Sequence, residues 1–182
     1  MTYAIQDLAI RDVAPADADE ITDLVAAAMW DGPVARWMHP DPAVRRRNCP
    51  AYSEIVVEHA VRYGEVYATV DDDSGRLTGV ALWFPPTSTV PSMKYQQRRH
   101  PLEPHYYLAF LVVHPDSRCR GVGSALLERH HARLDRAGIP SYLEASHPRN
   151  RDLFLRHGYR VRSVIELPDG PPLWTMWRWP VV

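Results

Sequence analysis

The chain has 182 residues, 46% of them hydrophobic and 24% charged, and its 21 basic and 22 acidic residues leave a formal net charge of −1. This balance favours one globular domain over residues 1–182 and excludes a global positive field that would attract nucleic acid or an anionic membrane. The two cysteines, Cys49 and Cys119, form neither a CxxC pair nor a His/Cys cluster. Because no leader or membrane-length apolar run is visible either, we expect reduced thiols, no metal site and a cytoplasmic protein.

The N-terminal third predicts one strand followed by two helices. "LAIRDVA", residues 8–14, is typical of a strand, and a helix with acidic residues in its first turn is expected from Pro15 onwards. Residues 41–63 carry apolar side chains at helical spacing, with Ile55, Val56 and Ala60 predicted on one side. Pro50 lies within this stretch, where we expect it to break or start a helix.

The middle of the chain predicts a hairpin, a long connection and a central strand. "EVYATV" and "LTGVALWF" flank the polar turn "DDDSGR", which indicates a hairpin over residues 65–84. The basic, proline-rich residues 85–104 are long for a connection, and such segments are often functional or locally helical. "HYYLAFLVV", residues 105–113, is continuously apolar and aromatic, so we predict a central strand buried on both faces.

The C-terminal part predicts a helix, a strand, a short helix and a final hairpin. The first helix runs over about residues 121–137 and is closed by Gly138, with His130 and His131 expected in solvent. "PSYLEA" follows as a strand, "RNRDLFLRHG" as a short helix, and "VRSVIEL" and "LWTMWRW" as strands joined by "PDGPP". The predicted order is β-α-α-β-β-β-α-β-α-β-β, an α/β fold with a mixed sheet flanked by helices.

One turn concentrates positive charge and glycine at the start of a helix. In "VVHPDSRCRGVGSALL", residues 112–127, a strand ends, a proline turn follows, and a helix begins near Gly121. The first amides of a helix have no internal partner and form an anion site with the helix dipole. Glycines at 121 and 123 leave room for a pyrophosphate, and Arg118 and Arg120 add charge. We therefore predict a phosphate-bearing ligand; a plain strand-to-helix turn is the alternative.

The same stretch resembles the coenzyme A loop of the GNAT acetyltransferases. That family's signature is Arg or Gln, two residues, Gly, one residue, and Gly or Ala, and residues 118–123, Arg-Cys-Arg-Gly-Val-Gly, match it. "YLEASHPRNRDLFLRHGYRV" resembles the segment that follows in the family, and "ELPDGPPLWTMWRW" resembles the last hairpin of a bacterial branch that includes the puromycin N-acetyltransferases. The resemblance implies the GNAT fold and acetyl-CoA as co-substrate. Dimers are common in the family, so a homodimer is one assembly to expect.

The resemblance also implies which residues hold the cofactor. The pantetheine arm would pair with the strand backbone, an N–H near Leu111 would face the thioester oxygen, and loop amides would bind the pyrophosphate. Asn150 would contact the pantetheine, or alternatively cap the last helix. Arg149, Arg151 and Arg156 could reach the 3′-phosphate, or form an exposed basic face. The full cofactor set is Leu111, Val112, Val113, Arg118, Cys119, Arg120, Gly121, Val122, Gly123, Ser124, Asn150, Phe154 and Arg156.

Two positions bear on catalysis. We predict Glu144 as the general base, with a structural strand carboxylate as the alternative and with His105, His147 and His157 as further titratable candidates. Where the family commonly has a tyrosine that protonates the leaving thiolate, this chain has Phe154, which has no proton to donate. Tyr106 or Tyr107 could replace it from the central strand, although a core or cleft-wall aromatic is the favoured alternative for each taken separately. The predicted catalytic set is Glu144, Tyr107 and the Leu111 amide.

These features predict an N-acetyltransferase that acts on a primary amine of a small molecule by direct attack in a ternary complex. Aromatic side chains at Trp30, Trp37, Tyr52 and Trp83 could line the amine site beside Glu144, or be core. Two alternatives stay open. One is acetylation of a protein N-terminus or lysine, which needs an open groove. The other is a coenzyme A-binding sensor with little catalysis, which the phenylalanine at position 154 motivates.

Overall fold

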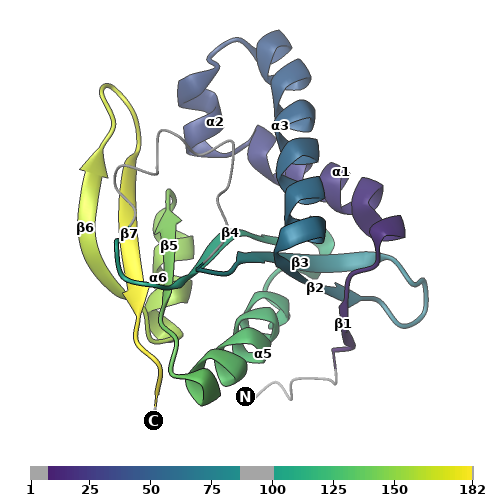
Figure 1. Ribbon diagram of the computed structural model, residues 1–182. Helices are drawn as coiled ribbons and strands as arrows, with labels where there is room; N and C mark the ends of the chain where they lie inside the picture. The colour runs from purple at the N-terminus through teal and green to yellow at the C-terminus, as the bar shows by residue number, and fades with distance from the viewer. Residues whose placement is uncertain (1–7, 87–100, 182) are drawn as a thin grey trace.

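A seven-stranded mixed sheet organises the molecule (Figure 1). The computed structural model describes residues 8–86 and 101–181. In spatial order the sheet runs β1-β2-β3-β4-β5-β7-β6, and the β4–β5 pairing is parallel, whereas the other neighbours are antiparallel. The strands are β1 (Ile10–Asp12), β2 (Glu65–Val70), β3 (Leu77–Phe84), β4 (Tyr106–Val113), β5 (Ser141–Ala145), β6 (Arg160–Glu166) and β7 (Pro172–Arg178).

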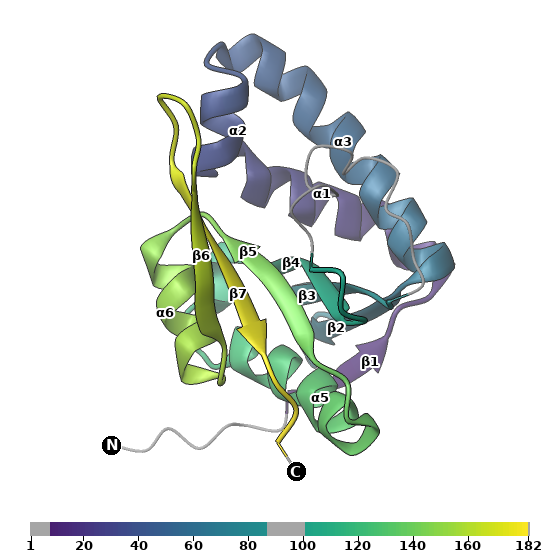
Figure 2. The same ribbon diagram turned by 60° about the vertical axis from the view of Figure 1, so that its left-hand side comes forward.

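Helices cover both faces of this sheet, as Figures 1 and 2 show. The helices α1 (Ala18–Trp30), α2 (Pro33–Met38) and α3 (Pro42–Tyr63) lie on one side, and α5 (Val122–Ala137) and α6 (Pro148–Arg156) lie on the other. Two apolar cores result, one on each face of the sheet. The predicted mixed α/β sheet flanked by helices is confirmed, and α2 is one helix more than the sequence indicated. No helix in the described residues is both long and apolar enough to cross a membrane.

The prediction that Pro50 breaks or starts a helix is wrong. Helix α3 runs unbroken through it for 22 residues. Proline costs a backbone hydrogen bond inside a helix, but Cys49 and Ser53 on either side of it are buried, so packing holds the helix together. The predicted apolar face also shifts: Val56 and Ala60 are buried, whereas Ile55 is 53% exposed.

The expectation that His130 and His131 are solvated is also wrong. Both belong to the buried face of α5, with 0% and 5% of their surface exposed. His130 stacks on Trp83 with ring centroids 4.1 Å apart, and the Nε2 of His131 lies 3.2 Å from the Tyr159 hydroxyl. A neutral imidazole can pack in a core as an aromatic ring does. The prediction failed because it treated histidine only as a polar surface residue.

The remaining elements follow the sequence closely. The hairpins β2–β3 and β6–β7 form as predicted, and α5 ends at Gly138, whose φ of +68° is the left-handed cap conformation. Most of the predicted connection over 85–104, namely residues 87–100, lies outside the described residues.

Candidate active site

The central strand separates from its parallel neighbour where the site is expected. β4 pairs with β5 only at Tyr106–Ser141 and Tyr107–Tyr142, and the register between β4 and β3 shifts near Ala109, which has no counterpart on β3. A bulge bends its strand and often lies beside an active site. Residues 109–111 are accordingly only partly buried, which corrects the expectation of a strand buried throughout. Within the described residues, β4 beyond Tyr107 therefore offers backbone groups that β5 does not pair.

Glu144 lies at this opening and accepts two tyrosine hydroxyl groups. The Tyr107 hydroxyl donates to Oε2 at 2.9 Å, and the Tyr142 hydroxyl donates to Oε1 at 2.8 Å. Glu144 is two residues beyond Tyr142 on β5, so both side chains share one face of the sheet. The predicted base and the predicted acid are thus in direct contact.

Burial raises the pKa of each of the three groups, Glu144, Tyr107 and Tyr142. Burial raises the pKa of Glu144 above its ordinary value, although the tyrosine hydrogen bonds oppose that rise. Burial, and then the nearby Glu144 carboxylate, raise the pKa of Tyr107 and of Tyr142. The cluster therefore contains a carboxylate that accepts protons more readily than usual and two tyrosines that keep their protons at neutral pH.

Aromatic rings surround this cluster. The Tyr107 and Tyr142 rings lie 6.0 Å apart, and His105 approaches the rings of Tyr142 and Trp177 at 5.4 Å and 5.3 Å. Burial lowers the pKa of His105, so this predicted titratable candidate is neutral at neutral pH. Tyr52 of α3 packs against the same core. The structure thus brings His105 and Tyr52 to the Glu144 side of the sheet.

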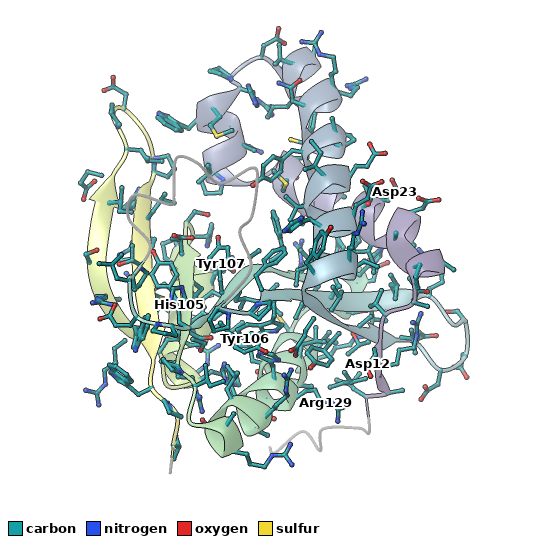
Figure 3. All side chains as sticks on the ribbon, viewed as in Figure 1. Asp12, Asp23, His105, Tyr106, Tyr107 and Arg129 are labelled. Carbon is teal, nitrogen blue, oxygen red and sulfur yellow. The ribbon has the colours of Figure 1, made fainter. Side chains whose placement is uncertain are left out.

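Tyr106 points the other way and is not at this site. It packs in the core beneath α5, whereas Tyr107 packs beneath α1 and α3, and Figure 3 shows the two labelled side chains on either side of the strand. The Tyr106 hydroxyl donates to the Glu65 carboxylate at 2.7 Å. Strand alternation assigns neighbouring residues to opposite faces, so of the two tyrosines only Tyr107 can act with Glu144.

The predicted phosphate loop has a backbone suited to an anion. Cys119 and Gly121 have φ angles of +61° and +85°, and no side chain caps the first turn of α5. Gly121 is required by this left-handed backbone. At Gly123, by contrast, an added Cβ would meet its nearest protein atoms at an ordinary 3.6 Å. The fold itself therefore does not demand glycine at 123, which fits a position kept small for a ligand.

The predicted site residues of α6 divide between the surface and the core. His147 caps α6, with its Nδ1 accepting from the Arg149 amide at 3.2 Å, so the alternative that Asn150 caps this helix is wrong. Asn150 is exposed at its first turn, as is Arg156 at its last. Phe154 is 6% exposed and packs edge-on against Tyr159. The phenylalanine thus serves the core.

The three tryptophans predicted at the amine site lie in different surroundings. Trp83 is fully buried on the α5 side, so the structure does not bring it to the site. The ring centroid of Trp30 lies 5.0 Å from the Cζ atom of Arg45, whose guanidinium stacks over the ring. Trp37 instead reaches the β6–β7 turn, where its Nε1 donates to the Pro168 carbonyl at 2.8 Å. A Cβ on Gly170 would come within 2.7 Å of that indole, so α2 and the turn are in close contact.

Sequence reasoning missed Tyr142 as a site residue. The signal was present, because Tyr142 and Glu144 are two apart on a predicted strand and must share a face. Asp31, at the end of α1, forms an ion pair with Arg36 of α2 at 2.8 Å. In the described ranges, no three His, Cys, Asp or Glu side chains gather into a group that could hold a metal ion.

Comparison with known proteins agrees with this geometry. A protein-family model, described as the acetyltransferase (GNAT) domain, matches residues 62–161 of this chain. That range contains the hairpin, the splayed strand, the phosphate loop and Glu144. The chain belongs to the GNAT acetyltransferase family and is an acyltransferase.

Solved structures share the fold over nearly the whole chain. A structure from Corynebacterium glutamicum ATCC 13032, titled histone acetyltransferase HPA2 and related acetyltransferase, is 28% identical with a TM-score of 0.81, covering 97% of this chain and 98% of that one. Arylalkylamine N-acetyltransferase 2 from Aedes aegypti is 12% identical with a TM-score of 0.68, covering 97% and 100%. The ribosomal-protein-S18-alanine N-acetyltransferase from Escherichia coli is 16% identical with a TM-score of 0.60, covering 96% and 94%. The last two show the fold alone, and their names cover small amines and a protein.

Proposed function

We propose that this chain, working as one domain, transfers the acetyl group of acetyl-CoA to a primary amine of a small molecule such as a metabolite or an antibiotic. The observation that carries the proposal is the contact of Glu144 with Tyr107 at the mouth of the β4–β5 splay. The family uses acetyl-CoA, which supplies a thioester-activated acetyl group. The backbone of Leu111, Val112 and Val113 and the amides of residues 120–124 would hold it.

Glu144 and Tyr107 can move the protons that the reaction requires. The Glu144 carboxylate takes a proton from the acceptor ammonium, which frees the nitrogen lone pair for attack on the acetyl carbonyl. As the carbon–sulfur bond breaks, the Tyr107 hydroxyl gives its proton to the sulfur, and Glu144 returns the first proton to Tyr107. The amide nitrogen releases the second proton of the former ammonium to solvent. The raised pKa of Glu144 favours the first step. The Tyr107–Glu144 hydrogen bond connects the acid to the base. The protein therefore gains and loses no net proton over the reaction.

The contact between α2 and the β6–β7 turn favours a small acceptor over a polypeptide. Trp37 bonds to Pro168, and Gly170 lies against its indole. A polypeptide laid across the site needs a groove open at both ends, whereas this contact joins the two segments on the Glu144 side of the sheet. Loss of the contact should admit larger acceptors.

A thiol-release assay tests the proposed reaction. We expect acetyl-CoA to be consumed with small primary amines, with an intersecting initial-velocity pattern and no acetylated protein in the mass spectrum without an amine. Turnover only with peptide N-termini or lysines would favour the protein-directed alternative. Trp37→Phe, which keeps the ring and loses the Pro168 hydrogen bond, should raise the KM for the amine and leave the KM for acetyl-CoA unchanged.

The state of the cysteines supports a cytoplasmic location as part of the proposal. Cys49 is buried and Cys119 exposed, and both are free thiols. An exposed thiol persists most easily in a reducing compartment. Immunolocalisation or fractionation of the cells that make the protein would test this.

A further inference from the structure

One histidine contacts the phosphate loop from another helix. His157 follows the last turn of α6, and its Nε2 lies 2.9 Å from the Ser124 hydroxyl oxygen in the first turn of α5. The two residues are 33 positions apart in sequence. Ser124 is one of the residues whose amides the proposed function assigns to the diphosphate, so the side chain contact lies immediately behind that position.

The hydrogen bond between these side chains has two directions with different consequences. If the Ser124 hydroxyl donates to a neutral His157, its proton is committed and cannot reach a ligand. If His157 Nε2–H donates to Ser124, the serine proton is free to point at an anion. An anion at the first turn of α5 selects the second arrangement, because a phosphate oxygen accepts and cannot donate.

We propose that His157 is a positioning residue for the diphosphate and acts through Ser124 as a two-link hydrogen-bond relay. His157 takes one proton from solvent as the anion binds, Nε2–H donates to the Ser124 oxygen, and the Ser124 hydroxyl donates to a phosphate oxygen. No bond of the ligand is broken. This inference rests on the proposed function, since it assumes that the ligand is a coenzyme A compound.

The surroundings of His157 favour its neutral form in the absence of an anion. Burial lowers its pKa, the Glu128 carboxylate of α5 raises it, and Arg156 of α6 and Arg178 of β7 lower it. The ring of His131, also on α5, lies 6.4 Å away, and burial holds that histidine neutral too. An added phosphate charge opposes the two arginines, so binding should shift His157 toward its charged form.

Calorimetry in buffers of different ionisation enthalpy measures this proton directly. Dephospho-CoA is the main probe, because the 3′-phosphate of CoA titrates near pH 6 itself and would obscure the signal. At about pH 6, just below the ordinary imidazole value, dephospho-CoA should bind with uptake of a few tenths of a proton. Pantetheine, which has no phosphate, should bind with none.

Two variants and one control separate the relay from simple folding effects. His157→Asn should bind dephospho-CoA roughly three- to tenfold more weakly and without proton uptake. Ser124→Ala, which keeps His157, should also lose the uptake. His39→Asn, at the end of α2, removes a distant imidazole and should leave both the affinity and the uptake unchanged. Thermal unfolding of each variant confirms that the fold is retained.

The outcomes distinguish this inference from the proposed function. Failure of the wild-type protein to bind any coenzyme A compound would overturn both. Tight binding of dephospho-CoA with no uptake, or with an uptake that survives His157→Asn, would overturn the relay alone. Uptake that survives Ser124→Ala would also overturn it, because His157 would then act without the serine.

Discussion

The two faces of the sheet each carry a glutamate that accepts two tyrosine hydroxyl groups, yet the two clusters differ in what surrounds them. Adjacent residues of β4 supply one tyrosine to each: Tyr106 donates to Glu65 at 2.7 Å, and Tyr107 donates to Glu144 at 2.9 Å. The second donors are Tyr67 and Tyr142, at 2.9 Å and 2.8 Å. The side chains are alike, so residue type alone does not separate a structural cluster from a reactive one.

The difference lies in charge and location. Glu65 forms an ion pair with Arg133, and His130 lies 3.6 Å from it, beneath α5 and at the start of β2. Glu144 lies where β4 and β5 separate, and burial raises its pKa. A guanidinium holds a carboxylate in its charged form, whereas burial makes it a better proton acceptor. From this difference we expect the Glu65 cluster to stabilise the fold, and we propose the Glu144 cluster as the reactive one.

Glu144→Gln should give the largest loss of activity. The amide keeps the size of the side chain but cannot take a proton, so kcat/KM should fall about 10²–10⁴-fold. The matched change Glu65→Gln should leave kcat/KM near wild type and lower the free energy of unfolding by about 1–2 kcal/mol, because Arg133 loses its anion. Steady-state kinetics and chemical denaturation on both proteins measure this. Equal effects of the two changes on kcat/KM would break the comparison.

Acid should weaken the α5 side through its buried histidines. Burial lowers the pKa of His130 and of His131 to about 3, below the ordinary 6.5. Neutral histidine is therefore favoured in the fold, and this stabilisation is complete above pH 6.5 and is lost as the pH falls from 6.5 toward 3. Each histidine should cost up to about 1.4 kcal/mol per pH unit in that window.

Urea unfolding at pH 7 and at pH 5 measures the loss, and the matched variant His130→Phe should reduce it. Phenylalanine keeps a ring against Trp83 and cannot be protonated, and in the described part of the chain neither ring nitrogen of His130 has a hydrogen-bond partner to lose. An unchanged pH dependence in this variant would assign the acid sensitivity to other groups.

Tyr107→Phe should lower kcat by about tenfold, a smaller effect than that of Glu144→Gln, because a thiolate is a fair leaving group without an acid. Tyr106→Phe is the control from the opposite face, and it should change stability by about 1 kcal/mol through the lost Glu65 hydrogen bond. The test is to measure kcat of both variants at saturating acetyl-CoA and amine. The proton-donor role of Tyr107 fails if its variant keeps full kcat.

Tyr142→Phe should give the smallest and most specific effect. Its hydroxyl lowers the pKa of Glu144, so its removal should raise that pKa further. The acid limb of the kcat/KM profile should then move up by roughly 0.7 pH unit, the equivalent of one hydrogen bond. A pH profile from 5 to 9 measures the shift, and movement in the opposite direction would exclude Glu144 as the group that titrates.

Much of the architecture could be read from local patterns. The hairpin over β2 and β3, the Gly138 cap and the loop at residues 118–123 depend on turn residues and alternation, and these are local properties of the backbone. The continuity of α3 through Pro50 and the burial of His130 could not be read in this way. Both depend on neighbours from other elements, which outweigh the preference of the single residue.

By itself, the sequence determined the family, the glycine-rich turn before α5 and the element order apart from α2, because glycine, proline and apolar spacing restrict the backbone over a few residues at a time. The tertiary structure alone decided that Tyr107 and Tyr142 meet on Glu144, that Tyr106 turns to Glu65, and that His157 reaches Ser124. Each of these contacts joins segments whose relative placement follows from the splay of β4 and β5 and from the packing of α5 and α6 on the sheet. No local sequence pattern predicts a contact between segments that lie so far apart in the chain.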